Sequence, residues 1–101
     1  MTRFCIEIEA VYTMEDNEGK PIDEDQKVFF VIFHDNMNRE KWKDLINRKL
    51  EENKPEIDED EEDGSSYVLD GYCPVGHAVS LTDTSYSVYK NFYKNLIDLS
   101  T

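Results

Sequence analysis

The sequence predicts an α+β domain of order ββαββα, in which a four-stranded antiparallel sheet carries two helices packed on one face. Residues 3–12 alternate between apolar and polar side chains, residues 27–34 form an apolar run, and residues 83–100 repeat aromatic and aliphatic side chains at helical spacing. The chain has 101 residues, of which 39% are hydrophobic and 12% aromatic. Residues 1–101 are therefore expected to form a single compact domain with its own core.

The first two strands are expected to form a hairpin. Residues 3–12 place an apolar side chain at every second position, which is typical of a half-buried strand. Residues 27–34 are apolar on both faces and rich in β-branched and aromatic side chains, which is typical of a central strand. Residues 15–25 contain an asparagine, a glycine and a proline, all of which favour turns. A long hairpin loop is therefore expected over residues 15–25.

The first helix is expected over residues 38–53, where apolar residues from Trp42 to Leu50 recur at helical spacing. Asn36 or Asn38 would cap its start, and a Lys-Pro pair would end it.

A second hairpin is expected from residues 65–73 and 77–82, which flank a Pro-Val-Gly turn, and Gly71 within it could mark a β-bulge. The last helix is expected over residues 83–100, with a cap at Asp83 or Thr84. The residues of this helix that we expect to pack on the sheet are Tyr89, Phe92, Tyr93, Leu96 and Ile97.

The net charge narrows the classes of partner. The chain has 11 basic and 23 acidic residues, a formal net charge of −12 and an isoelectric point near 4.4. Nucleic acids and anionic membranes are therefore poor direct partners, whereas basic proteins are natural ones. The longest apolar stretch, Val28 to Phe33, is too short to span a membrane. With no secretory signal at the start and two cysteines expected to be free thiols, we expect a cytoplasmic protein, in the host cytoplasm if it is viral.

Acidic residues concentrate in two expected loops, 15–25 and 54–64. The strand over residues 27–34 would run away from the first loop and the helix after it would return, so both loops are expected at the same end of the sheet. The candidate partner-binding residues are Glu15, Asp16, Glu18, Asp23, Glu24, Asp25, Glu56, Asp58, Glu59, Asp60, Glu61, Glu62 and Asp63.

Three interpretations of this acidic surface stay open at the level of sequence. It could be a solvated region with no dedicated partner, which is the commonest use of acidic runs. It could bind Ca²⁺ as an EF-hand loop. In that register, however, the side chain of Glu59 at the first position is too long and that of Asp70 at the last position is too short. It could also imitate the anionic track of a nucleic acid and block a basic groove.

The function expected from the third interpretation is that of a small acidic inhibitor of a basic, nucleic-acid-binding protein. By analogy of composition, this class includes phage-type anti-restriction and anti-CRISPR inhibitors, which act as DNA mimics. The alternatives are an immunity protein that neutralises a nuclease toxin, or a small domain with a structural zinc or a weak calcium site and no mimicry.

No catalytic signature or cofactor motif is present, so we expect a protein that is not an enzyme and needs no cofactor. Cys5, His34, Cys73 and His77 would make a complete tetrahedral zinc set if the fold gathered them, but free cysteine is often a small buried apolar residue. The sequence leaves the zinc question and the oligomeric state open.

Overall fold

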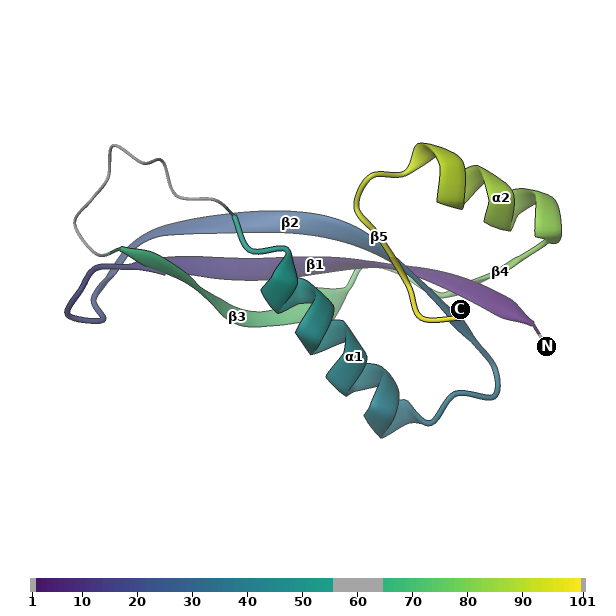
Figure 1. Cartoon of the computed structure of the whole chain (residues 1–101), viewed down its shortest axis with the longest axis horizontal. Helices are drawn as coiled ribbons and strands as arrows, with labels where there is room; N and C mark the ends of the chain where they lie inside the picture. Colours follow the sequence, from purple (N-terminus) through teal and green to yellow (C-terminus); the bar gives the residue numbers. More distant parts are fainter. Residues whose placement is uncertain (1, 56–64, 101) are drawn as a thin grey trace.

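The computed structural model describes residues 2–55 and 65–100, which form one mixed sheet of five strands and two helices (Figure 1). The α+β class is therefore confirmed, but the sheet has five strands rather than four. The elements are β1 (Arg3–Glu15), β2 (Pro21–His34), α1 (Arg39–Glu52), β3 (Ser66–Pro74), β4 (Val79–Leu81), α2 (Asp83–Phe92) and β5 (Leu96–Asp98).

The long hairpin of β1 and β2 is the framework of the sheet. The two strands pair along their whole length, from Arg3 opposite His34 to Glu15 opposite Pro21. The predicted hairpin is confirmed, but the predicted loop over residues 15–25 is wrong. Only residues 16–20 turn, because the backbone ladder continues through three acidic residues of β2, which are accommodated on a strand whose side chains are largely exposed.

The predicted second hairpin is also wrong. β3 and β4 do not pair with each other; both lie along the same edge of β1, antiparallel to it. The connection between them continues to follow β1, since the Val75 amide donates to the Glu7 carbonyl at 2.8 Å. The bulge suggested at Gly71 is present: Val11 faces Gly71 and Tyr12 faces Leu69, so Asp70 is the extra residue.

The two helices lie on opposite faces of the sheet, and the prediction that both pack on one face is wrong. α1 packs Ile46 and Leu50 against the face that includes Phe29. α2 covers the other face, where the Tyr89 ring lies 5.7 Å from the ring of Phe30. Successive residues of a strand point to opposite faces of the sheet. Because α1 packs on the face of Phe29 and α2 contacts Phe30, the two helices lie on opposite faces. A strand that is apolar on both faces, such as β2, needs other elements to cover both of them.

The C-terminal helix is shorter than its periodicity predicts. α2 ends at Phe92, and residues 96–98 form β5, which pairs in parallel with β2. Backbone hydrogen bonds explain the break, because the Phe30 amide donates to the Asn95 carbonyl and the Leu99 amide to the Ile32 carbonyl. The expected burial of Phe92 is wrong, since it is 78% exposed.

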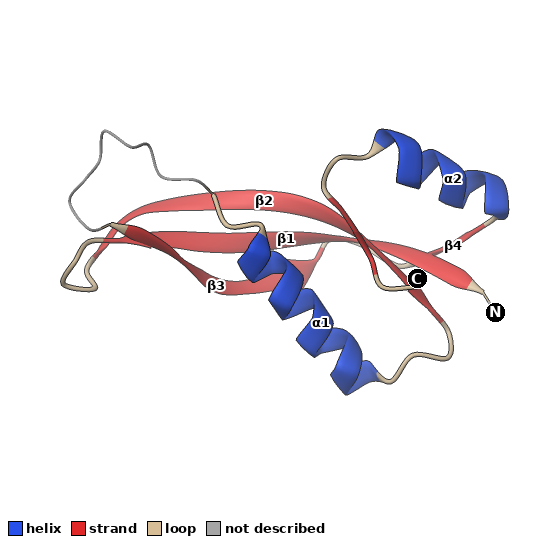
Figure 2. Ribbon diagram, in the orientation of Figure 1, coloured by secondary structure: helices blue, strands red, loops and turns tan. Residues whose placement is uncertain are grey.

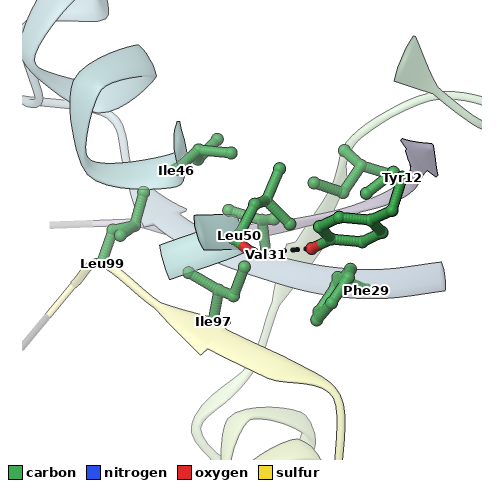
Figure 3. Close-up of a cluster of buried hydrophobic side chains, with 9 residues drawn as sticks. Tyr12, Phe29, Val31, Ile46, Leu50, Ile97 and Leu99 are labelled. Atoms are coloured by element: carbon green, nitrogen blue, oxygen red, sulfur yellow. Dashed lines mark hydrogen bonds between the residues drawn. The ribbon is translucent and has the colours of Figure 1, made fainter. Parts of the chain in front are cut away.

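The core lies between α1 and the sheet, and it is closed from the side by β5 (Figure 3). Its buried residues are Ile8, Ala10, Tyr12, Phe29, Val31, Ile46, Leu50, Ile97 and Leu99. The hydroxyl of Tyr12 donates to the Leu50 carbonyl at 2.7 Å, which satisfies a carbonyl near the C-terminal end of α1. Burial, together with the nearby charge of Glu51, raises the pKa of Tyr12 to about 12.

The molecule is elongated, with extents of 48 × 28 × 23 Å and a radius of gyration of 15.7 Å. A compact chain of this length would have a radius of gyration of about 13 Å. The difference arises because the β1–β2 hairpin extends beyond the helices at one end (Figure 2). Within the described residues, neither helix has the length and apolarity that a membrane span needs.

Candidate functional site

The candidate site is the tip of the β1–β2 hairpin, which lies at one extreme of the long axis (Figure 1). We call it the acidic hairpin and define it by six carboxylates: Glu15, Asp16, Glu18, Asp23, Glu24 and Asp25. All six were predicted as partner-binding residues, and the fold brings them together on one turn and the strand ends that flank it.

Asp16 stabilises the turn through its hydrogen bonds. The Asp16 carboxylate accepts hydrogen bonds from the amides of Glu18 and Lys20, both at 2.9 Å, and the Asp16 amide donates to the Lys20 carbonyl. Gly19 has a φ of +80°, a left-handed conformation that favours glycine. Asp16 is therefore a positioning residue, and it leaves Glu18 exposed at the tip.

Three consecutive carboxylates on β2 continue the negative surface from the turn into the sheet. Asp23, Glu24 and Asp25 pair with Met14, Thr13 and Tyr12 of β1. Because residues of a strand alternate between faces, Asp23 and Asp25 lie on the face that carries α1 and Glu24 lies on the other. The acidic hairpin is consequently negative on both of its faces.

No cation within the described residues neutralises these carboxylates. The described ion pairs are Lys49–Glu52, Lys54–Glu51 and Lys90–Asp98, and none includes a member of the acidic hairpin. Among the basic residues of α1, which could have compensated the acids, Lys49 pairs with Glu52 three residues further on, and the others form no ion pair with a described residue. Lys20 is the one basic residue between positions 15 and 25.

The second predicted acidic loop, over residues 54–64, lies outside the described residues from position 56 onward. Glu56, Asp58, Glu59, Asp60, Glu61, Glu62 and Asp63 lie outside the described residues. The element that follows them does enter the sheet at the acidic hairpin, because Ser66 at the start of β3 pairs with Glu15.

The structure adds one carboxylate that is not among the predicted partner-binding residues. The bulge in β3 brings Asp70 next to Thr13, whose hydroxyl donates a hydrogen bond to it. The glycine that marks the bulge was the available signal, since an extra residue in one strand re-aims its neighbours. Asp70 extends the acidic surface from β2 across β1 to β3.

The four candidate zinc ligands are not assembled. Within the described residues, no group of three or more His, Cys, Asp or Glu side chains is placed to hold a metal ion. Cys5 is buried against Tyr89, and burial raises the pKa of its thiol, while Cys73 is exposed on β3 and pairs with Glu9. Both cysteines are free, so the structure supports neither the zinc site nor a disulfide.

Comparisons with protein-family models, with curated proteins and with solved structures found no match to this chain. The function must therefore be argued from the chemistry of its own residues.

Proposed function

We propose that this protein binds a basic, nucleic-acid-binding protein through the acidic hairpin and inhibits it by occupying the groove that its nucleic acid would fill. The observation that carries the proposal is the presence of six carboxylates on one projecting hairpin with no ion pair among the described residues. Self-repulsion between like charges opposes such an arrangement in the free protein, and a cationic partner would relieve it.

The spacing of the charges supports mimicry of a phosphate backbone. Consecutive residues of a strand advance by about 3.4 Å, which is also about the axial distance between phosphates along one strand of DNA. Counted over both faces of β2, Asp23, Glu24 and Asp25 therefore match the axial charge density of one nucleic-acid strand over three units, and Asp23 and Asp25, which share a face, are about 6.8 Å apart along the strand. Asp70 and Glu15 add charge on the neighbouring strands.

The elongated shape supports entry into a groove. The molecule is 23 Å across its shortest axis, and at the hairpin end none of its described helices covers the sheet (Figure 2). Exposed charges act mainly through steering, so association should be fast and strongly dependent on salt. Nucleases that read DNA through a basic groove are the proposed class of target, as in phage-type inhibitors of restriction or CRISPR enzymes, and the cytoplasm is the proposed place of action.

The experiment that tests this proposal pairs two variants with the same change in charge. Asp23→Asn/Glu24→Gln removes two carboxylates from the acidic hairpin, and Glu40→Gln/Asp44→Asn removes two exposed carboxylates from α1. Nucleic-acid-binding proteins are enriched from a bacterial lysate on heparin, captured with the tagged wild-type chain, identified by mass spectrometry, and purified for assays of binding and nuclease activity.

We expect the purified target to lose activity when the wild-type chain is added and to recover it when excess duplex DNA competes. The hairpin variant should associate at least about tenfold more slowly than the α1 variant in 0.05 M salt, and the difference should shrink as salt rises. Equal association rates for the two variants, or inhibition that DNA does not reverse, would show that the acidic hairpin does not act as a mimic.

A further inference from the structure

The end of the molecule opposite the acidic hairpin contains a hollow that the proposed function does not use. It has a volume of about 380 Å³ and lies beside the connection between β2 and α1. Its apolar walls are Ile6, Phe33, Met37 and Trp42. The volume falls within the range of roughly 300–1,000 Å³ that is usual for small-molecule sites.

The walls of the hollow present aromatic rings in a defined arrangement. The ring centroids of Phe33 and Trp42 are 5.4 Å apart with an interplanar angle of 73°, which is an edge-to-face contact. Phe4 stacks on the far side of Phe33, with centroids 5.7 Å apart. Contacts between rings favour such offset or edge-to-face geometry, so a flat aromatic guest would find complementary partners here.

The polar groups that line the hollow favour a guest with hydrogen-bond acceptors. The side chain of Arg39 forms no ion pair or hydrogen bond with another described residue. His34 accepts a hydrogen bond from the Asn36 amide on Nδ1, which leaves Nε2 as the donor of the neutral ring. The one carboxylate in the lining, Asp35, already accepts from the Thr2 amide at 3.3 Å.

Trp42 supplies a further sign that this region is incomplete. Its indole Nε1 is buried and has no hydrogen-bond partner within the described residues. Buried donors in folded proteins are nearly always paired, and an exception calls for an explanation. Because this N–H makes no bond, the indole can turn toward an acceptor in the hollow without breaking one.

We propose that the hollow is a binding site for a small aromatic carboxylate, with its ring packed against the side chains of Phe33 and Trp42 and its carboxylate on Arg39. A guanidinium matches a carboxylate in a paired, two-bond geometry. A doubly charged phosphate fits less well, since Asp35 repels it and Arg39 is the only cation that lines this hollow among the described residues. The site is separate from the acidic hairpin and does not rest on the function proposed for it.

The experiment uses the full chain labelled with ¹⁵N and phenylacetate as the probe. The chain contains one tryptophan, so the indole N–H of Trp42 gives a single, assignable resonance, and tryptophan fluorescence reports the same site. We expect a saturable shift of that resonance with a dissociation constant of about 0.1–1 mM, as is usual for a ligand of this size.

Two variants on the same helix test the role of the guanidinium. Arg39→Gln should weaken the binding of phenylacetate about tenfold, whereas Arg48→Gln, which makes the same change in charge outside the hollow, should change it less than about twofold. Phenylacetamide, which lacks the charge, should bind the wild-type chain and Arg39→Gln equally weakly. The Asp23→Asn/Glu24→Gln variant should bind phenylacetate as the wild type does, whatever its effect on a protein partner.

Three outcomes would overturn the proposal. The first is an indole resonance that phenylacetate does not shift in a saturable way. The second is equal binding by Arg39→Gln and Arg48→Gln. The third is tighter binding of phenyl phosphate than of phenylacetate, which would show that the site does not select a carboxylate.

Discussion

The two ends of this molecule differ in how their charged side chains are paired. At the helix-bearing end, the side chains pair with one another: the guanidinium of Arg3 lies 4.2 Å from the ring centroid of Tyr86, and Tyr86 donates to Asp98 at 2.5 Å. At the acidic hairpin, the charged side chains pair with no described cation. The comparison indicates that the helix-bearing end holds the fold together, while the hairpin end leaves its charge available.

Asp98 is the centre of the network at the helix-bearing end. Its side chain is 7% exposed and lies 3.2 Å from the ammonium of Lys90. Desolvation by burial opposes its charge, but hydrogen bonds from Ser100, Tyr86 and Lys90 outweigh that effect and hold the pKa of Asp98 below its usual value. This carboxylate ties the C-terminal strand β5 to α2.

The largest expected effect is the loss of a core side chain. Leu50→Ala should lower the free energy of unfolding by about 2–5 kcal/mol, because Leu50 is fully buried between α1 and the sheet. Phe92→Ala, which removes a larger but 78% exposed side chain, should cost less than about 0.5 kcal/mol. Urea denaturation of both variants measures the two values. Similar losses would mean that the core does not lie where the structure places it.

Much of this core could be predicted from the sequence. The α1 helix follows from its apolar periodicity, and Asn38 caps it as one of the two predicted caps, accepting from the Glu40 amide at 2.9 Å. The apolar run of β2 correctly indicated a central strand. Its two apolar faces also indicate that both sides of the sheet must be covered by helices, which a sheet with both helices on one face does not satisfy.

Other features could not be derived from local pattern. The spacing of Tyr89, Tyr93 and Ile97 fits a helix, and only the unpaired edge of β2 converts residues 96–98 into a strand. Acidic residues are depleted in strands, so Asp23–Asp25 favoured a loop. Pairing with β1 overrides that preference, because the side chains of Asp23 and Glu24 stay exposed.

The next largest effect is expected at Asp98. Asp98→Ala should lower the free energy of unfolding by about 2–3 kcal/mol, because four donor groups on Tyr86, Lys90 and Ser100 lose a charged acceptor. Since the pKa of Asp98 is lower in the folded state than in the unfolded chain, its contribution is present above about pH 4 and is lost as the pH falls through the folded-state value.

The pH dependence separates this prediction from a simple loss of packing. Asp98→Asn, which keeps the size of the side chain, should remove part of the decline in stability below about pH 4. Denaturant titrations of the wild type and Asp98→Asn between about pH 2 and pH 7 measure the difference. Parallel curves over that range would show that Asp98 does not contribute as a charge.

A smaller effect is expected where the two ends meet. Tyr12→Phe should lower the free energy of unfolding by about 1 kcal/mol, because the carbonyl of Leu50 loses its hydroxyl donor. The variant should also lose the tyrosine that ionises last, since burial and Glu51 raise the pKa of Tyr12 to about 12. Ultraviolet titration of the phenolate counts the tyrosines that ionise below that pH. If the variant instead lost one of the tyrosines that ionise at about pH 10, Tyr12 would ionise like an exposed tyrosine and its raised pKa would be wrong.

The smallest effect on stability is expected at the acidic hairpin, where the effect on binding should be greatest. Neutralising Asp23, Glu24 and Asp25 to their amides should change the free energy of unfolding by less than about 0.5 kcal/mol, and in the stabilising direction at low salt, because repulsion between unpaired carboxylates is relieved. Asp16 is left intact, since its carboxylate holds the turn.

The same comparison decides between the two acidic stretches. A second variant neutralises Asp58, Glu59, Asp60, Glu61, Glu62 and Asp63, which lie outside the described residues. If the hairpin is the principal recognition surface, removing its three charges should slow association with the basic target more per charge than removing these six. The reason is that pairing with β1 fixes the backbone of Asp23–Asp25 before a partner binds, so this backbone loses little conformational freedom on binding. Stopped-flow measurements over a range of salt concentrations give the rate for each variant. A larger loss per charge in the second variant would assign recognition to residues 58–63 rather than to the hairpin.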